Sequence, residues 1–143
     1  MNIDFNEIKK YFDDKYYDLG YIDKKDIKFL SNAPIKLHSI DIQETEDFSY
    51  GIVFVKKTIN YDYSMFNEIL EILNKNFKKM SFYFWEHINL KNSVVLSGLG
   101  QYGKNQLVYS YKFGFDIHIA VVLIKDIIIN LPERKKANWN FLP

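Results

Sequence analysis

The stretch that decides the fold of this chain spans residues 97–107 and reads SGLGQYGKNQL. Three glycines stand close together, with a lysine and an asparagine directly after them: Gly98, Gly100, Gly103, Lys104 and Asn105. Because glycine has no Cβ, this spacing is typical of backbone that turns sharply, adopts a positive φ or lies close to another surface. The residues before it, 92–97, predict a short helix that ends at Gly98.

Two generic nucleotide motifs match this stretch poorly. The glycines fit G-x-G-x-x-G, but a dinucleotide site needs a strand before the motif and a helix after it, whereas here a helix is predicted before it. A phosphate loop ends in Gly-Lys-[Ser/Thr], whereas here Asn105 follows Lys104 and the four-residue gap between the glycines is missing. Both nucleotide-binding interpretations are therefore weak.

The same stretch, continued through Phe113 and Gly114 to a strand at residues 117–123, resembles a segment of the epoxyqueuosine reductases and their corrinoid-dependent iron–sulfur relatives. In that family the segment belongs to a cobalamin-binding domain with a nitroreductase-like scaffold, and a ferredoxin-like domain follows it. The resemblance covers residues 88–123. It implies an α+β fold with a central, mainly antiparallel sheet flanked by helices, and a role in the modification of tRNA with queuosine.

The resemblance also implies a binding role for the glycine stretch. Cobalamin would lie against the loop, and the residues implied as its contacts are Gly98, Leu99, Gly100, Gly103, Lys104 and Asn105. In this arrangement Lys104 and Asn105 would hydrogen-bond amide or phosphate groups of the cofactor. The reductases place an aspartate as proton donor shortly before the motif, and here only Glu86 and His87 could take that catalytic role.

The chain contains no cysteine, so it cannot hold a cysteine-ligated iron–sulfur cluster, and no metal site is predicted. Corrinoid reduction would then need electrons from a separate ferredoxin-type donor. Alternatively, the chain is a truncated form of a longer protein, or a homologue that kept the scaffold for another purpose. Two alternative functions remain open: a non-catalytic, self-associating α+β interaction module, and an FMN-binding relative.

Composition limits the partners. The chain of 143 residues has 19 basic and 18 acidic side chains, so its net charge of +1 exerts no long-range attraction on nucleic acid or anionic membranes. Arg134 is the only arginine, which leaves tRNA binding weakly supported. With no signal peptide and no long apolar run, the sequence predicts a cytoplasmic protein without membrane contact. The aromatic residues 82–85 and the apolar end of the chain predict a homo-oligomer.

Periodicity predicts the elements. Residues 4–19 have the pattern of an amphipathic helix with Gly20 as its left-handed cap, and residues 21–47 are expected to be loop-rich with a short strand near 35–40. A central strand is predicted at 50–55 and a helix from Ser64 to about Met80. Further strands are expected at 107–111, 117–125 and 127–131. Residues 1–131 would form a single domain, and residues 132–143 a basic, loosely ordered tail.

Overall fold

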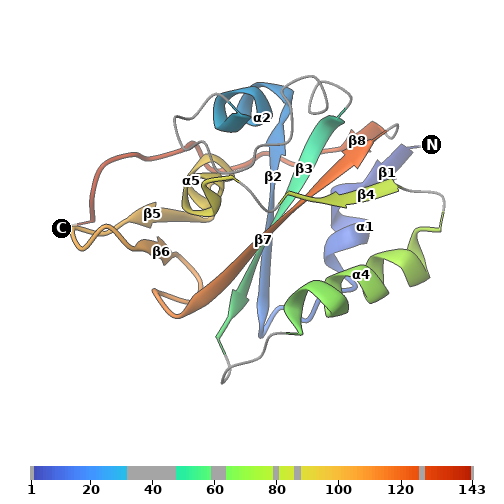
Figure 1. Ribbon diagram of the computed structural model, residues 1–143, viewed down its shortest axis with the longest axis horizontal. Coiled ribbons are helices and arrows are strands. Elements are labelled where there is room, and N and C mark those ends of the chain that lie inside the picture. Colours follow the sequence, from blue (N-terminus) through green and yellow to red (C-terminus); the bar gives the residue numbers. More distant parts are fainter. Residues whose placement is uncertain are drawn as a thin grey trace.

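The centre of the molecule is a four-stranded antiparallel sheet (Figure 1). The computed structural model describes residues 2–31, 48–58, 64–78, 81–85, 88–125 and 128–142. The strands lie in the order β2 (Tyr17–Asp23), β3 (Phe48–Lys57), β7 (Ile117–Lys125) and β4 (Ser81–Phe84). The predicted fold class, α+β with a central antiparallel sheet and flanking helices, is confirmed.

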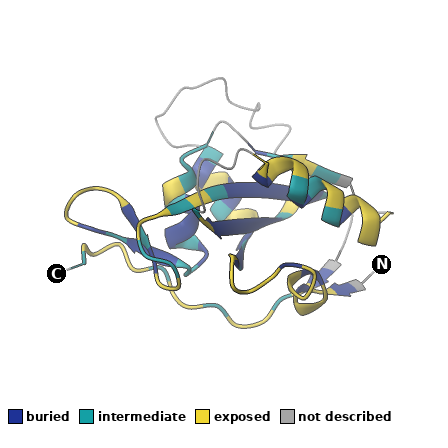
Figure 2. Ribbon diagram, turned by 90° about the horizontal axis from the view of Figure 1, so that it is seen from below, coloured by how far each residue is buried: buried dark blue, intermediate teal, exposed yellow. Residues whose placement is uncertain are grey.

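Both faces of the central strands are buried, which explains why β3 and β7 are apolar at successive positions. One core cluster joins alternate residues of these strands, such as Phe54 and Val122, to α1 (Phe5–Lys9) and α4 (Met65–Asn76). The other cluster joins the opposite residues, such as Val53 and Val121, to α2 (Lys24–Ser31) and α5 (Leu90–Leu96). Figure 2 shows the buried strands between helices whose outer surfaces are exposed.

Two small sheets complete the fold. β1 (Asn2–Asp4) pairs in parallel with β8 (Ile128–Asn130), which brings Ile3 and Ile129 together in the core. β5 (Gly100–Tyr102) pairs antiparallel with β6 (Val108–Ser110) and forms a hairpin directly after α5. This hairpin contains most of the glycine stretch.

The predicted helix over residues 4–19 is wrong beyond its first turns. Asp4 caps α1 by accepting a hydrogen bond from Asn6 N at 2.9 Å, but the helix ends at Lys9 and Tyr17 begins β2. β2 pairs along its whole length with β3, and this tertiary pairing overrides the local helical pattern. Gly20 is therefore not a helix cap. It lies within β2, where a Cβ would lie 2.9 Å from Leu99 Cγ.

The remaining predictions mostly agree with the structure. The central strand and the strand at 117–125 are confirmed as β3 and β7, and the helix after Ser64 is confirmed but ends at Asn76. The strands expected at 107–111 and 127–131 are the shorter β6 and β8. Helix α2 lies where a loop-rich region was predicted, and the strand predicted near 35–40 falls outside the described residues.

Candidate functional site

The glycine stretch begins at the end of α5, where the backbone reverses direction. Asn89 starts this helix by accepting a hydrogen bond from Asn92 N at 3.1 Å. At the other end Gly98 has φ +77°, and two backbone bonds, Leu99 N to Val94 O and Gly98 N to Val95 O, close the helix. This bond pair is the Schellman motif, which requires a left-handed residue and favours glycine. The predicted helix end at Gly98 is confirmed. Gly98 also adopts a positive φ, one of the three backbone features that the glycine spacing predicts for the stretch.

The chain itself fills the space beside each of the three glycines. A Cβ on Gly98 would lie 2.3 Å from Lys135 O, and one on Gly100 would lie 2.3 Å from Tyr109 O. A Cβ on Gly103 would lie 2.8 Å from Asn105 Oδ1 and 3.0 Å from Phe115 Cζ. The absence of side chains at Gly98 and Gly100 therefore allows close packing within the protein, so neither glycine forms an open cradle.

An open hollow of about 570 Å³ lies at the tip of the β5–β6 hairpin. The residues that line it, which we call the hollow residues, are Gly103, Lys104, Asn105, Tyr109, Phe115 and Leu142. The rings of Tyr109 and Phe115 meet edge to face with their centroids 5.1 Å apart, and Phe115 is 43% exposed. The hollow thus combines aromatic surface with a cation and an amide, and it unites three of the six residues predicted to contact a cofactor.

The backbone at the hairpin tip is tightly specified. Gln106 has φ +65°, a conformation that few residues other than glycine adopt, and its N–H donates to Gly103 O at 3.0 Å. Asn105 Oδ1 accepts a hydrogen bond from Leu107 N at 3.1 Å. Residues held in such conformations are concentrated at ligand sites. Lys104 is exposed beside this turn and available to a ligand.

Residues 132–142, which we call the C-terminal segment, run from the end of β8 to the β5–β6 hairpin (Figure 1). Leu142, near the end of this segment, lines the hollow. The segment, predicted as a loosely ordered tail, hydrogen-bonds to the hairpin: Leu142 N donates to Tyr102 O at 2.8 Å, and Gln101 Nε2 donates to Asn140 O at 2.7 Å. Lys135 Nζ lies 4.1 Å from the centroid of the Tyr111 ring. These contacts attach the segment to the glycine stretch at several points.

A second cavity, of about 180 Å³, lies where α1, β2, residues 97–99 and the C-terminal segment meet. Asp18 of β2 lines it, and burial raises the pKa of this carboxyl above its ordinary value of 3.8, against the opposing attraction of Lys112 and Lys9 and a backbone hydrogen bond from Leu19. Half-buried carboxyls with raised pKa values can transfer protons. Sequence reasoning missed Asp18, because this region was predicted to be helical.

The catalytic residues predicted from the sequence cannot be placed. Glu86 and His87, the candidate catalytic pair, lie outside the described residues. Among the residues that the structure describes, no three or more His, Cys, Asp or Glu side chains gather as a metal site would require. None of the described helices has the length and apolar character needed to cross a membrane.

Comparison with known proteins links this fold to one group of enzymes. No protein-family model and no curated protein matches the sequence. Epoxyqueuosine reductase from Streptococcus thermophilus superposes with a TM-score of 0.60 at 12% identity, over 92% of this chain and 47% of that chain. Epoxyqueuosine reductase with a tRNA-Tyr epoxyqueuosine-modified stem loop gives a TM-score of 0.58 at 11% identity, over 89% and 47%.

The enzyme from Bacillus subtilis gives a TM-score of 0.54 at 11% identity, over 87% of this chain and 46% of that chain. This chain therefore spans about half the length of the epoxyqueuosine reductases that it matches. At such low identity the likeness concerns the arrangement of helices and strands. The conclusion is that this chain has the fold of roughly half of an epoxyqueuosine reductase.

Proposed function

We propose that this chain is a corrinoid-binding domain of the epoxyqueuosine reductase type, and that cobalamin is held at the hollow. The observation that carries the proposal is the grouping of Gly103, Lys104 and Asn105 with two aromatic rings around one open hollow. These three residues come from the stretch that resembles the family. The shared fold supports the same assignment independently of that stretch.

The hollow residues suit such a ligand chemically. A corrinoid presents a broad, largely apolar ring whose edge carries amide groups, so it needs apolar surface together with polar side chains at the margin. Tyr109, Phe115 and Leu142 offer the apolar surface, while Lys104 and Asn105 offer a cation and an amide. Gly98, Leu99 and Gly100 would act indirectly, because they pack against the C-terminal segment, β2 and β6.

A bound corrinoid would supply redox chemistry at its cobalt, which the side chains of this protein cannot provide. Because the chain has no cysteine for a cluster, we propose that electrons come from a separate ferredoxin-type protein. Reduction of epoxyqueuosine in tRNA is the activity that the relatives' names indicate, and it would be the reaction proposed here. Contact with tRNA would depend on lysines, because the only arginine is bound to Asp26.

The proposal is tested by mixing the purified protein with cobalamin and recording its absorbance spectrum and its elution with the protein on gel filtration. We expect a shifted spectrum and co-elution, both weakened by Phe115→Ala and Lys104→Ala. Tyr83→Ala is the matched control, because this exposed aromatic residue lies on β4, away from the hairpin. No shift and no co-elution at high micromolar cobalamin would overturn the proposal, and binding of FMN instead would favour the flavin alternative.

A second candidate function, self-association, is favoured by the exposed edge of the sheet. Within the described residues β4 pairs only with β7, and its Tyr83 is 46% exposed beside Phe48, with ring centroids 5.9 Å apart. Uncharged aromatic edge strands tend to pair with other strands. Light scattering at tens of micromolar should then show a dimer that Tyr83→Lys disrupts, and a monomeric wild-type protein would exclude this candidate.

A further inference from the structure

We propose that Arg134 is a positioning residue for the hollow. It fixes the C-terminal segment, and the far end of this segment places Leu142 in the wall of the hollow. The ligand in this inference rests on the proposed function, whereas the coupling between Arg134 and Leu142 does not. Arg134 acts on Leu142 through the C-terminal segment and not by direct contact.

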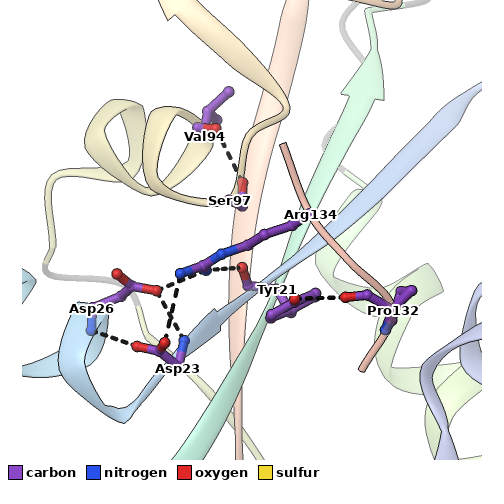
Figure 3. A network of polar contacts seen from close by, with 7 residues as sticks. All are labelled: Tyr21, Asp23, Asp26, Val94, Ser97, Pro132 and Arg134. Atoms are coloured by element: carbon purple, nitrogen blue, oxygen red, sulfur yellow. Dashed lines mark hydrogen bonds and ion pairs between the residues drawn. The ribbon is translucent and has the colours of Figure 1, made fainter. Parts of the chain in front are cut away.

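Arg134 anchors the segment through several contacts at once (Figure 3). The guanidinium lies 2.7 Å from Asp26 Oδ2 and 3.6 Å from Asp23 Oδ2, and it donates a hydrogen bond to Tyr21 O at 2.9 Å. It also lies over the Tyr21 ring, 5.0 Å from the centroid. Charge-assisted bonds of this kind are roughly twice as strong as neutral ones. No other residue type offers a planar fork of five donors for such a set of partners.

The surface that receives Arg134 is itself held in place. Asp26 N donates to Asp23 Oδ1 and Asp23 N donates to Asp26 Oδ2, both at 3.0 Å, which is the reciprocal arrangement of a capping box at the start of α2. Asp26 is only 13% exposed, so its ion pair with Arg134 is poorly screened by solvent. Tyr21 adds a further tie, because its hydroxyl donates to Pro132 O at 2.6 Å.

Beyond Arg134 the segment is held by point contacts and forms no helix or strand. Lys135 O fills the space beside Gly98, Ala137 packs on the core, and Trp139 lies against Phe29 with ring centroids 6.2 Å apart. The hydrogen bond from Leu142 N to Tyr102 O then fixes the end at the hollow. Because no continuous hydrogen-bond ladder holds this segment, loss of the contacts at Arg134 should loosen it as a unit.

The first test follows the segment without any ligand. In Arg134→Gln we expect hydrogen exchange at the Leu142 amide, measured by NMR, to accelerate about tenfold or more, which is about 1.4 kcal/mol of local protection. The fluorescence of Trp139 should shift to the red as its contact with Phe29 is lost. Arg134→Lys should restore part of the protection. The matched control is Lys136→Gln, an exposed residue of the same segment, which should leave both signals unchanged.

The second test asks whether this anchoring reaches the ligand. Arg134→Gln and Leu142→Ala should each weaken cobalamin binding. The double variant should bind cobalamin as well as the single variant that has the lower affinity, because both changes act on the same contact, that of Leu142 with the ligand. Unchanged exchange at Leu142 in Arg134→Gln, or strictly additive losses of affinity, would overturn the inference. If the wild-type protein binds no cobalamin but the exchange result holds, the proposed function fails and the positioning role of Arg134 stands.

Discussion

Gly98 and Gly114 have nearly the same backbone conformation, with φ +77° and +78°, but different surroundings. A Cβ on Gly98 would lie 2.3 Å from Lys135 O, whereas the nearest atom to a Cβ on Gly114 is Tyr109 Cε2 at 3.7 Å. Gly114→Ala should lower the free energy of unfolding by about 1–2 kcal/mol, the cost of a left-handed alanine. Gly98→Ala should lower it further, because the C-terminal segment must move.

Urea denaturation measures the free energy of unfolding of both variants, and the fluorescence of Trp139 reports on the environment of the C-terminal segment. The signal should change in the folded state of Gly98→Ala and not in that of Gly114→Ala. Equal losses of unfolding free energy would show that the contact between Lys135 and Gly98 contributes nothing. The comparison separates the conformational cost, which both positions share, from the packing that only one of them has.

The carboxyl of Asp18 makes stability depend on pH in a defined direction. Burial raises its folded-state pKa above 3.8, so its contribution to stability is complete at low pH and is lost as the pH rises through the folded-state pKa. Asp18→Asn should therefore be more stable than wild type near neutral pH, with an advantage that shrinks as the pH falls toward 3.8. Urea denaturation of both proteins between neutral pH and pH 3.8 measures this difference in unfolding free energy. A stability advantage of Asp18→Asn that grows on acidification would contradict the prediction.

Among the helices and strands, the local sequence predicted those whose pattern is set by their own burial. β3 and β7 are apolar at successive positions because both of their faces are covered, and this signal is visible in the sequence. β2 could not be predicted in this way, because its apolar residues continue the helical spacing of α1. Its strand conformation is set by the pairing with β3, which is distant in the sequence. The capping box of Asp23 and Asp26 was a usable signal for the start of α2.

The candidate site was predictable to a similar degree. The unusual backbone of the glycine stretch follows from residue type, since a positive φ and close contacts favour glycine. The contact of Lys135 with Gly98 and the cavity that Gly98 and Asp18 line together could not be foreseen, because both residues are far from Gly98 in the chain. The sequence therefore indicated where the unusual backbone lies, but not which side of the loop remains open.

Helix α5 carries the glycine stretch, so the cap at its start should matter for stability. Asn89→Ala removes the acceptor for Asn92 N and should lower the free energy of unfolding by about 1 kcal/mol, the usual value of such a cap. Lys91→Ala, at an exposed position of the same helix, should change it by less than about 0.5 kcal/mol. Thermal and urea denaturation measure both, and equal effects would mean that the cap is not what stabilises α5.

Across the molecule as a whole, the C-terminal segment contacts parts that lie far apart in the sequence. It starts beside β8, passes the beginning of α2 at Arg134, and ends at the hairpin that bears the hollow (Figure 1). The central sheet forms the core of the molecule, while the hollow is formed by the hairpin, Phe115 and Leu142 of this segment. A ligand bound at the hollow would therefore stabilise the C-terminal segment, and loosening the segment would lower the affinity for the ligand.

Binding of cobalamin at the hollow, and not against Gly98 and Gly100, can be tested by amide chemical-shift mapping. Cobalamin is added to the ¹⁵N-labelled protein and the shift of every amide resonance is followed to saturation. We predict that the largest changes fall on the hollow residues, while the amides of Gly98 and Gly100 move little because neither residue lines the hollow. Saturable changes centred on Gly98 and Gly100, or no changes at all, would contradict this assignment.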